Sequence, residues 1–165
     1  MRYTPLLAAA ALALVATPAP AQPVTLTPQQ VAQIFCISRI GNDMAPVEGL
    51  LTVGLRSAIA DAELRNASIG QERPGDKPPL GDGIPWQAMP DRADQCRPGP
   101  VAFMMDAANV GIDYSFRAYP EADFSDTLAL RLVDNPAGTR VWRIDNILYA
   151  GNGDLQATLT DAFLD

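Results

Sequence analysis

The chain contains no histidine, a single lysine (Lys77) and two cysteines among its 165 residues. Without histidine there is no Ser-His or Cys-His pair to activate a nucleophile, no imidazole ligand for zinc or haem iron, and no imidazole base near pH 7. The 12 basic side chains are outnumbered by 19 acidic ones, which gives a formal net charge of -7. Because this charge repels nucleic acids and anionic lipids, we expect neither as a partner.

The sequence also lacks an apolar run of the roughly 20 residues that a membrane-spanning helix needs. Its most apolar stretch, residues 6–16, follows Arg2 and precedes the small residues Ala19-Pro20-Ala21. A basic start, a short apolar stretch and a small-residue cleavage point are typical of a secretory signal peptide. We therefore predict a signal peptide over 1–21 and no membrane anchor. The mature chain, 22–165, would be periplasmic or secreted, and loss of Arg2 would take its charge from -7 to -8.

Export bears on the two cysteines, Cys36 and Cys96. Cysteines in an oxidising compartment are usually paired, so we predict a disulfide between them. The alternative is a buried thiol on the apolar face of a helix. A catalytic thiol is disfavoured, because the chain has no histidine to hold it as a thiolate.

Two amphipathic helices are predicted at the start of the mature chain. Thr27 is placed to cap the first, with Pro28 in its first turn, Gln30 completing a capping box, and Gly41 at its end. A second helix is expected from about Pro46, where apolar residues recur at steps of three and four. These residues are Val47, Leu50, Leu51, Leu55, Ala58, Ile59 and Ala62.

Residues 68–100 are rich in proline and glycine, which disfavours a long helix or a central strand. We predict one long loop, of a length typical of functional or disordered segments. Trp86, in the sequence Ile84-Pro85-Trp86, is expected to hold the loop on the body as an apolar anchor. Stacking of Trp86 on a ligand is the alternative.

From Val101 onwards, apolar residues recur at every second position, which is typical of β-strands. We expect four antiparallel strands, over 101–106, 110–117, 128–133 and 142–149, with a hairpin turn at 135–138. Asp154 is placed to cap a short last helix. Helices followed by strands indicate a single α+β domain over 22–165, with a bent sheet over the helices.

The segment Trp142-Arg143-Ile144-Asp145-Asn146-Ile147-Leu148-Tyr149, followed by a glycine turn and a helix entered at Asp154-Leu155, carries a family resemblance. It resembles the terminal strand of exported bacterial proteins of the nuclear transport factor 2-like superfamily, and is most similar to their domain of unknown function 3828. This resemblance implies a cone in which two N-terminal helices pack in a curved four-stranded antiparallel sheet, with a short C-terminal helix. Relatives use the enclosed pocket for catalysis, ligand binding or pairing. Asn146 replaces the second acid of the family pattern, and fold alone implies no activity.

An enzyme built on this fold without histidine would need an aspartate base and a tyrosine or protonated aspartate as oxyanion donor, as in isomerases of the superfamily. The candidates are Asp106, Asp145, Tyr149 and Tyr114. Strand alternation brings no obvious acid and donor together on one face of a strand, although Asp145 and Tyr149 share a face. We expect Asp145 to pair instead with Arg143 or with a cross-strand Arg131 at the surface.

Neither a metal site nor a cofactor site is predicted. Glu121, Asp123 and Asp126 form an acidic cluster, but the spacing lacks the glycine and closing glutamate of a calcium loop. We interpret this cluster as a solvated loop. Gly151-Asn152-Gly153 has no lysine after it and is not a phosphate-binding loop.

These exclusions leave a binding or interaction function. We predict an exported, non-catalytic module for a small apolar ligand or a protein partner, with a histidine-independent isomerase or lyase as the alternative. An acidic surface favours a basic exported protein as partner, and a homodimer is expected. Trp86, Trp142 and Phe116 are the expected pocket or anchor residues. A polar hollow holding Asp106 or Asp145 beside a tyrosine would favour the enzyme.

Overall fold

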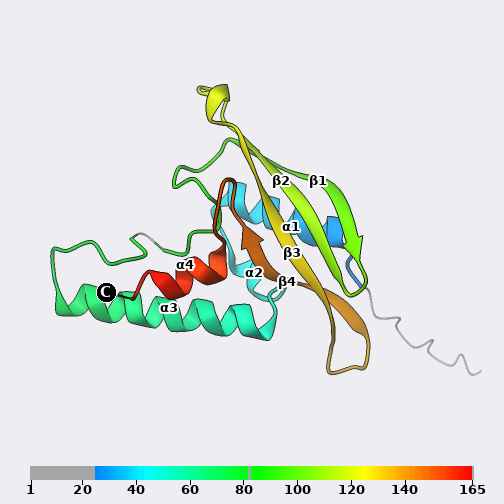
Figure 1. The fold of residues 1–165 in the computed structure, drawn as a ribbon, viewed down its shortest axis with the longest axis horizontal. Helices are drawn as coiled ribbons and strands as arrows, with labels where there is room; N and C mark the ends of the chain where they lie inside the picture. The colour runs from blue at the N-terminus through cyan, green and yellow to red at the C-terminus, as the bar shows by residue number, and fades with distance from the viewer. Residues whose placement is uncertain (1–24, 82, 165) are drawn as a thin grey trace, which may run out of the picture.

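A computed structural model of the chain describes residues 25–81 and 83–164, which form an α+β fold. The predicted signal peptide lies outside the described residues. Along the chain, helices α1 (Pro28–Gly41), α2 (Ala45–Glu48) and α3 (Val53–Glu72) come first (Figure 1). Strands β1 (Gln95–Met104), β2 (Ala107–Ser115), β3 (Phe124–Asp134) and β4 (Arg140–Leu148) follow, with the 3-10 turn η1 (Pro120–Ala122) before β3. Helix α4 (Leu155–Asp161) is the last element.

The four strands form one antiparallel sheet, as predicted, and their order in it is β1-β2-β3-β4. Each strand pairs with its neighbour in sequence, so every connection is a hairpin or a short loop. The predicted turn at 135–138 joins β3 to β4: the backbone N–H of Asn135 donates to Thr139 O at 2.9 Å, and the Asn135 side chain accepts from Ala137 and Thr139.

The loop predicted over 68–100 is shorter than expected at both ends, and that prediction was wrong there. Helix α3 continues to Glu72 and stops where Arg73 precedes Pro74, because a residue before proline avoids helical geometry. β1 begins at Gln95 and includes Pro98 and Pro100. Proline is tolerated because β1 is an edge strand whose register shifts between Pro98 and Val101.

The predicted second helix is divided into α2 and α3, and the cause is a contact with the sheet. Leu50 O accepts from the backbone N–H of Ile144 at 2.7 Å, and the N–H of Thr52 donates to Ile144 O at 2.9 Å. These bonds hold the segment between the helices extended beside β4 and occupy part of that strand's free edge. The side chain of Thr52 then caps α3 by accepting from the N–H of Leu55 at 3.3 Å.

The core lies between α1 and one face of the sheet, with α3 and α4 side by side at the β4 end (Figure 1). Alternate residues of β2 and β3 point into it, and β4 contributes Ile144 and Ile147, which lie on either side of a register shift in its pairing with β3. Its largest fully buried side chains are Tyr114, Phe35, Leu55, Ile112, Leu128, Leu130, Ile144, Ile147, Leu155, Val31, Val47 and Val110. The face of the sheet toward α1 is therefore filled by side chains.

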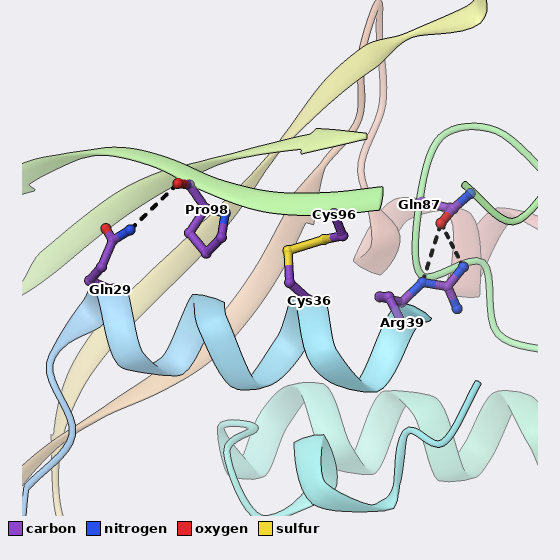
Figure 2. The surroundings of a disulfide bond; sticks show 6 residues. All are labelled: Gln29, Cys36, Arg39, Gln87, Cys96 and Pro98. Carbon is purple, nitrogen blue, oxygen red and sulfur yellow. Dashed lines mark hydrogen bonds between the residues drawn. A yellow bond between two sulfur atoms is a disulfide. The ribbon is translucent and has the colours of Figure 1, made fainter. Parts of the chain in front are cut away.

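The predicted disulfide is confirmed: Cys36 of α1 is bonded to Cys96 of β1 (Figure 2). The first turn of the same helix contacts the same strand, where Gln29 Nε2 donates to Pro98 O at 3.5 Å. The capping box of Thr27 and Gln30 is also present, and α1 ends at Gly41 as predicted. The covalent bond and the buried face of α1 therefore fix the helix against the edge of the sheet.

We expect removal of the disulfide to destabilise the fold. The double variant C36A/C96A frees a loop with a sequence separation of 60, and its free energy of unfolding should fall by about 4 kcal/mol in the chain-entropy account. Urea unfolding of both proteins measures the difference. A loss below about 1 kcal/mol would show that the disulfide does not stabilise the fold by restricting the unfolded chain.

The N-cap of α4 should show a pH-dependent contribution. The hydrogen bond from the backbone N–H of Ala157, at 2.9 Å, lowers the pKa of Asp154, and a bond from Asn146 lowers it further. The contribution is present above the unfolded pKa and is lost as pH falls through the lowered folded pKa. Asp154→Ala should thus cost about 1 kcal/mol near neutral pH and little in strong acid. Asp161→Ala, at the other end of the helix, is the matched control.

Candidate functional site

The segment 73–94, here called the strap, returns from the end of α3 to the start of β1 (Figure 1). Its described residues are fastened to the body at several points. The N–H of Leu80 donates to the Asn66 side chain of α3 at 2.9 Å, and Ala93 is buried. Ile84 and Trp86 are half-buried and pack against the core. The described residues of the strap are thus packed on the body of the fold, with Trp86 among the contacts.

Asp126 of β3 is a buried carboxylate that holds the strap from below. Asp126 is only 1% exposed. One of its carboxylate oxygens accepts from the backbone N–H of Ala88 at 3.0 Å, and the other accepts from the backbone N–H of Ala150 at 2.8 Å. Asp126 therefore joins the strap and the segment after β4 to the middle of the sheet. The prediction that Glu121, Asp123 and Asp126 lie in a solvated loop was therefore wrong for Asp126. Glu121 and Asp123 are exposed.

Arg39, in the last turn of α1, holds the strap from the side (Figure 2). Its Nη2 and Nε donate to Gln87 Oε1 at 2.6 and 3.3 Å. Gln87 is 5% exposed, and its Nε2 donates to the carbonyls of Met89 at 2.9 Å and Asp91 at 2.6 Å. One buried amide thus fixes the local path of the strap and positions the guanidinium.

Two tyrosines lie close to this polar group. The hydroxyl of Tyr114 is buried and forms no hydrogen bond of normal geometry with the described residues, although Arg39 lies beside it. Burial and the negative charge of Asp126 raise the pKa of Tyr114, against the opposing effect of Arg39. Tyr149 donates its hydroxyl to Pro85 O at 2.5 Å, and burial also raises its pKa. Both phenols therefore stay neutral near pH 7.

The pKa of Asp126 is raised because burial outweighs the stabilisation of its charged form by the N–H groups of Ala150 and Ala88 and by Arg39. A raised carboxylate pKa beside two phenols is the kind of grouping that an Asp/Tyr enzyme would use. Here, however, both oxygens are already bound by the backbone, and Asp126 does not line the pocket described below. A general base must come within hydrogen-bonding reach of its substrate, and this carboxylate is enclosed by protein.

The two aspartates singled out from the sequence lie elsewhere. Asp106, in the turn between β1 and β2, pairs with Arg140 at 2.7 Å, and its side chain is 68% exposed. Asp145 pairs with Arg131 across the strands at 3.0 Å, as expected. Exposed ion pairs of this kind contribute little to stability, typically under about 1 kcal/mol.

The other two aromatic candidates belong to the sheet. Phe116 stacks on Phe124 with ring centroids 6.3 Å apart, and Trp142 meets Phe103 edge-on at 6.1 Å. Phe116 and Trp142 are half-buried, pack against the core, and do not line the pocket at the strap. Of the three expected pocket or anchor residues, Trp86 is the one beside that pocket.

The pocket has a volume of about 630 Å³ and lies between the C-terminal end of α1 and the strap. Its walls combine apolar side chains with basic groups and backbone. Its described lining residues are Arg39, Asn42, Met44, Lys77, Pro79, Leu80, Gly81, Gly83, Ile84, Pro85, Trp86, Gln87, Ala88, Met89, Pro90 and Arg92. A site of this size fits a small organic molecule.

Within residues 25–81 and 83–164, no group of three or more Cys, Asp or Glu side chains is arranged to hold a metal ion. None of the helices in the same ranges has the length and apolar character needed to cross a membrane. Comparison with family models, with curated proteins and with solved structures finds no match to this chain. The strap pocket is therefore interpreted from its own geometry.

We expect Asp126→Asn to loosen the strap. An amide side chain has one acceptor oxygen, so one of the two backbone N–H groups would face a second donor, at a cost of about 1–3 kcal/mol. Amide hydrogen exchange at Ala88 or Ala150 should speed up more than in the control Asp113→Asn, whose side chain is exposed.

The Asp126→Asn variant, compared with wild type, also tests the direction in which the pKa of Asp126 is shifted. A carboxyl group with a raised folded pKa stabilises the fold most below its unfolded value, and this advantage falls as pH rises through the folded pKa. Urea unfolding should therefore give a larger cost of Asp126→Asn at pH 3.5 than at pH 7. A cost that grows with pH would mean that the pKa of Asp126 is lowered.

Proposed function

We propose that this protein is a non-catalytic binding module that holds a small, largely apolar molecule in the pocket between α1 and the strap. The observation that carries the proposal is the way the pocket is built. A long loop is fastened by Asp126, by Arg39 and by Tyr149, and the wall it forms exposes part of Trp86 to a space of about 630 Å³. A loop held at several points can form the wall of a preformed binding site.

The finer description of the fold is part of the same proposal. A cone of the nuclear transport factor 2-like kind, related to the domain of unknown function 3828, is supported by the antiparallel sheet, by α1 across one face and by the short α4. The face toward α1 is filled by core side chains, so the proposed ligand lies beside the cone. The disulfide supports a periplasmic or secreted location.

The enzyme alternative receives less support from the geometry. Asp126, which lies near the hydroxyls of both Tyr114 and Tyr149, is buried behind the strap with both oxygens occupied, and Asp154, which also acts on Tyr149, caps α4. The pocket lining contains no described carboxylate that could act as a base on a bound molecule.

Interaction with another protein is a second candidate, favoured by one exposed apolar feature. At the turn between β1 and β2, Phe103 is 65%, Met104 51% and Met105 99% exposed. Contiguous exposed apolar side chains are a mark of interaction sites. A basic exported protein or a second copy of the chain would be the occupant. The molar mass in solution, compared between wild type and the Phe103→Ser variant, tests the homodimer: a monomeric wild type would exclude it.

The binding proposal can be tested by fluorescence, because the chain has two tryptophans. In the variant Trp142→Phe, the emission comes from Trp86 alone. Titration with 1-octanol, a neutral apolar probe, should give a saturable blue shift as water leaves the indole. For a ligand of this size we expect a dissociation constant on the order of a millimolar.

The matched control is Trp86→Phe, which leaves Trp142 as the emitting residue in the sheet. Its emission should not respond to 1-octanol, because Trp142 does not line the pocket. Equal responses of the two variants, or a response that never saturates, would count against a site at the strap.

A further inference from the structure

The charges around the pocket differ in sign from those of the chain as a whole. The sequence has 19 acidic and 12 basic side chains. Among the described residues lining the pocket, the charged side chains are Arg39, Lys77 and Arg92, and none is acidic. Basic side chains at a pocket of a protein with a net negative charge favour a small anion as ligand.

Arg39 is half-buried without a salt bridge to a carboxylate among the described residues. Its hydrogen bonds go to the neutral amide of Gln87. Burial lowers the pKa of Arg39 and repulsion from Arg92 lowers it further, while Tyr114 and Asp126 raise it. A guanidinium remains protonated in proteins, so its charge stays in place.

Arg92 is the second cation of this pair. It lies on the strap, is exposed, and lines the same pocket as Arg39. It lies near enough to repel the Arg39 charge, and within the described ranges no carboxylate forms a salt bridge with it. Two like charges at one pocket gain most from a ligand that brings a negative charge between them.

We propose that the ligand of the strap pocket is an amphipathic organic carboxylate. Its carboxylate lies between Arg39 and Arg92, and its apolar chain lies against Met44, Ile84 and Trp86. The planar guanidinium groups match the geometry of a carboxylate, which two donors can bind side by side. This inference rests on the proposed binding function and adds the chemical class of the ligand.

The test compares octanoate with 1-octanol in the Trp142→Phe protein, because the two probes share an apolar chain and differ in charge. Octanoate should bind about 5-fold more tightly than 1-octanol at low salt, as expected for one exposed ion pair near the surface. The difference should shrink at high salt because ions screen exposed charges.

Arg92→Gln is the informative variant, because an exposed side chain can be replaced without disturbing the strap, whereas Arg39 also holds Gln87. This variant should lose most of the preference for octanoate over 1-octanol, because Arg39 alone then faces the carboxylate. The control is Arg140→Gln, which also removes one positive charge. Arg140 is the first residue of β4, whereas Ala150, which binds Asp126, follows the other end of that strand. This variant should therefore keep the preference for octanoate.

The outcomes separate the two proposals. If 1-octanol and octanoate bind equally well to the Trp142→Phe protein, with or without Arg92→Gln, the pocket binds apolar molecules and the carboxylate inference is overturned. If acetate competes as well as octanoate, the site takes simple anions and the apolar part of the inference is overturned. If neither eight-carbon probe binds, the binding function itself is wrong.

Discussion

The attachment of α1 to the edge of the sheet is the constraint on which the rest of the structure depends. Its apolar face covers the core, and the disulfide joins Cys36 to Cys96, the second residue of β1. Because β1 follows the strap directly, the same bond fixes the end of the strap to α1. Arg39 lies one helical turn beyond Cys36 and so reaches Gln87 (Figure 2). A covalent bond of this kind lets a small domain order a long connection that its core alone would not hold.

The strap has a polar attachment as well as an apolar one, and the two differ in what they specify. Trp86 and Ile84 contribute burial, which is non-directional. Asp126 contributes two directed hydrogen bonds, so it fixes the position of Ala88 relative to the sheet. Burying a carboxylate is costly, as its raised pKa shows, and the backbone donors offset this cost only in part. The arrangement fixes the part of the strap around Ala88, which forms part of the pocket wall.

The distribution of charge then separates two surfaces of the molecule. The sheet carries its ion pairs, Arg131 with Asp145 and Arg140 with Asp106, in solvent. Exposed pairs of this kind contribute little to stability. The strap pocket is lined by arginines, of which Arg39 donates its hydrogen bonds to the neutral amide of Gln87 and lies near enough to Asp126 for that carboxylate to favour its charge. Arg39 and Arg92 form no salt bridge with a described carboxylate, and the proposed ligand would supply one.

The sequence by itself determined the features that depend on residues a few positions apart or on composition. The capping box at Thr27, the cap at Asp154, the turn at 135–138 and the α+β class follow from local hydrogen bonding and periodicity. The pairing of the two cysteines followed from expected export. Only the tertiary structure decided that the helix breaks at Leu50, that prolines enter β1, and that Asp126 is buried. Alternation with Leu128 and Leu130 was a signal for the inward position of Asp126, but its partners are 24 and 38 residues away. Such contacts form between segments that the fold brings together, so no local pattern could reveal them, nor the pocket that they build.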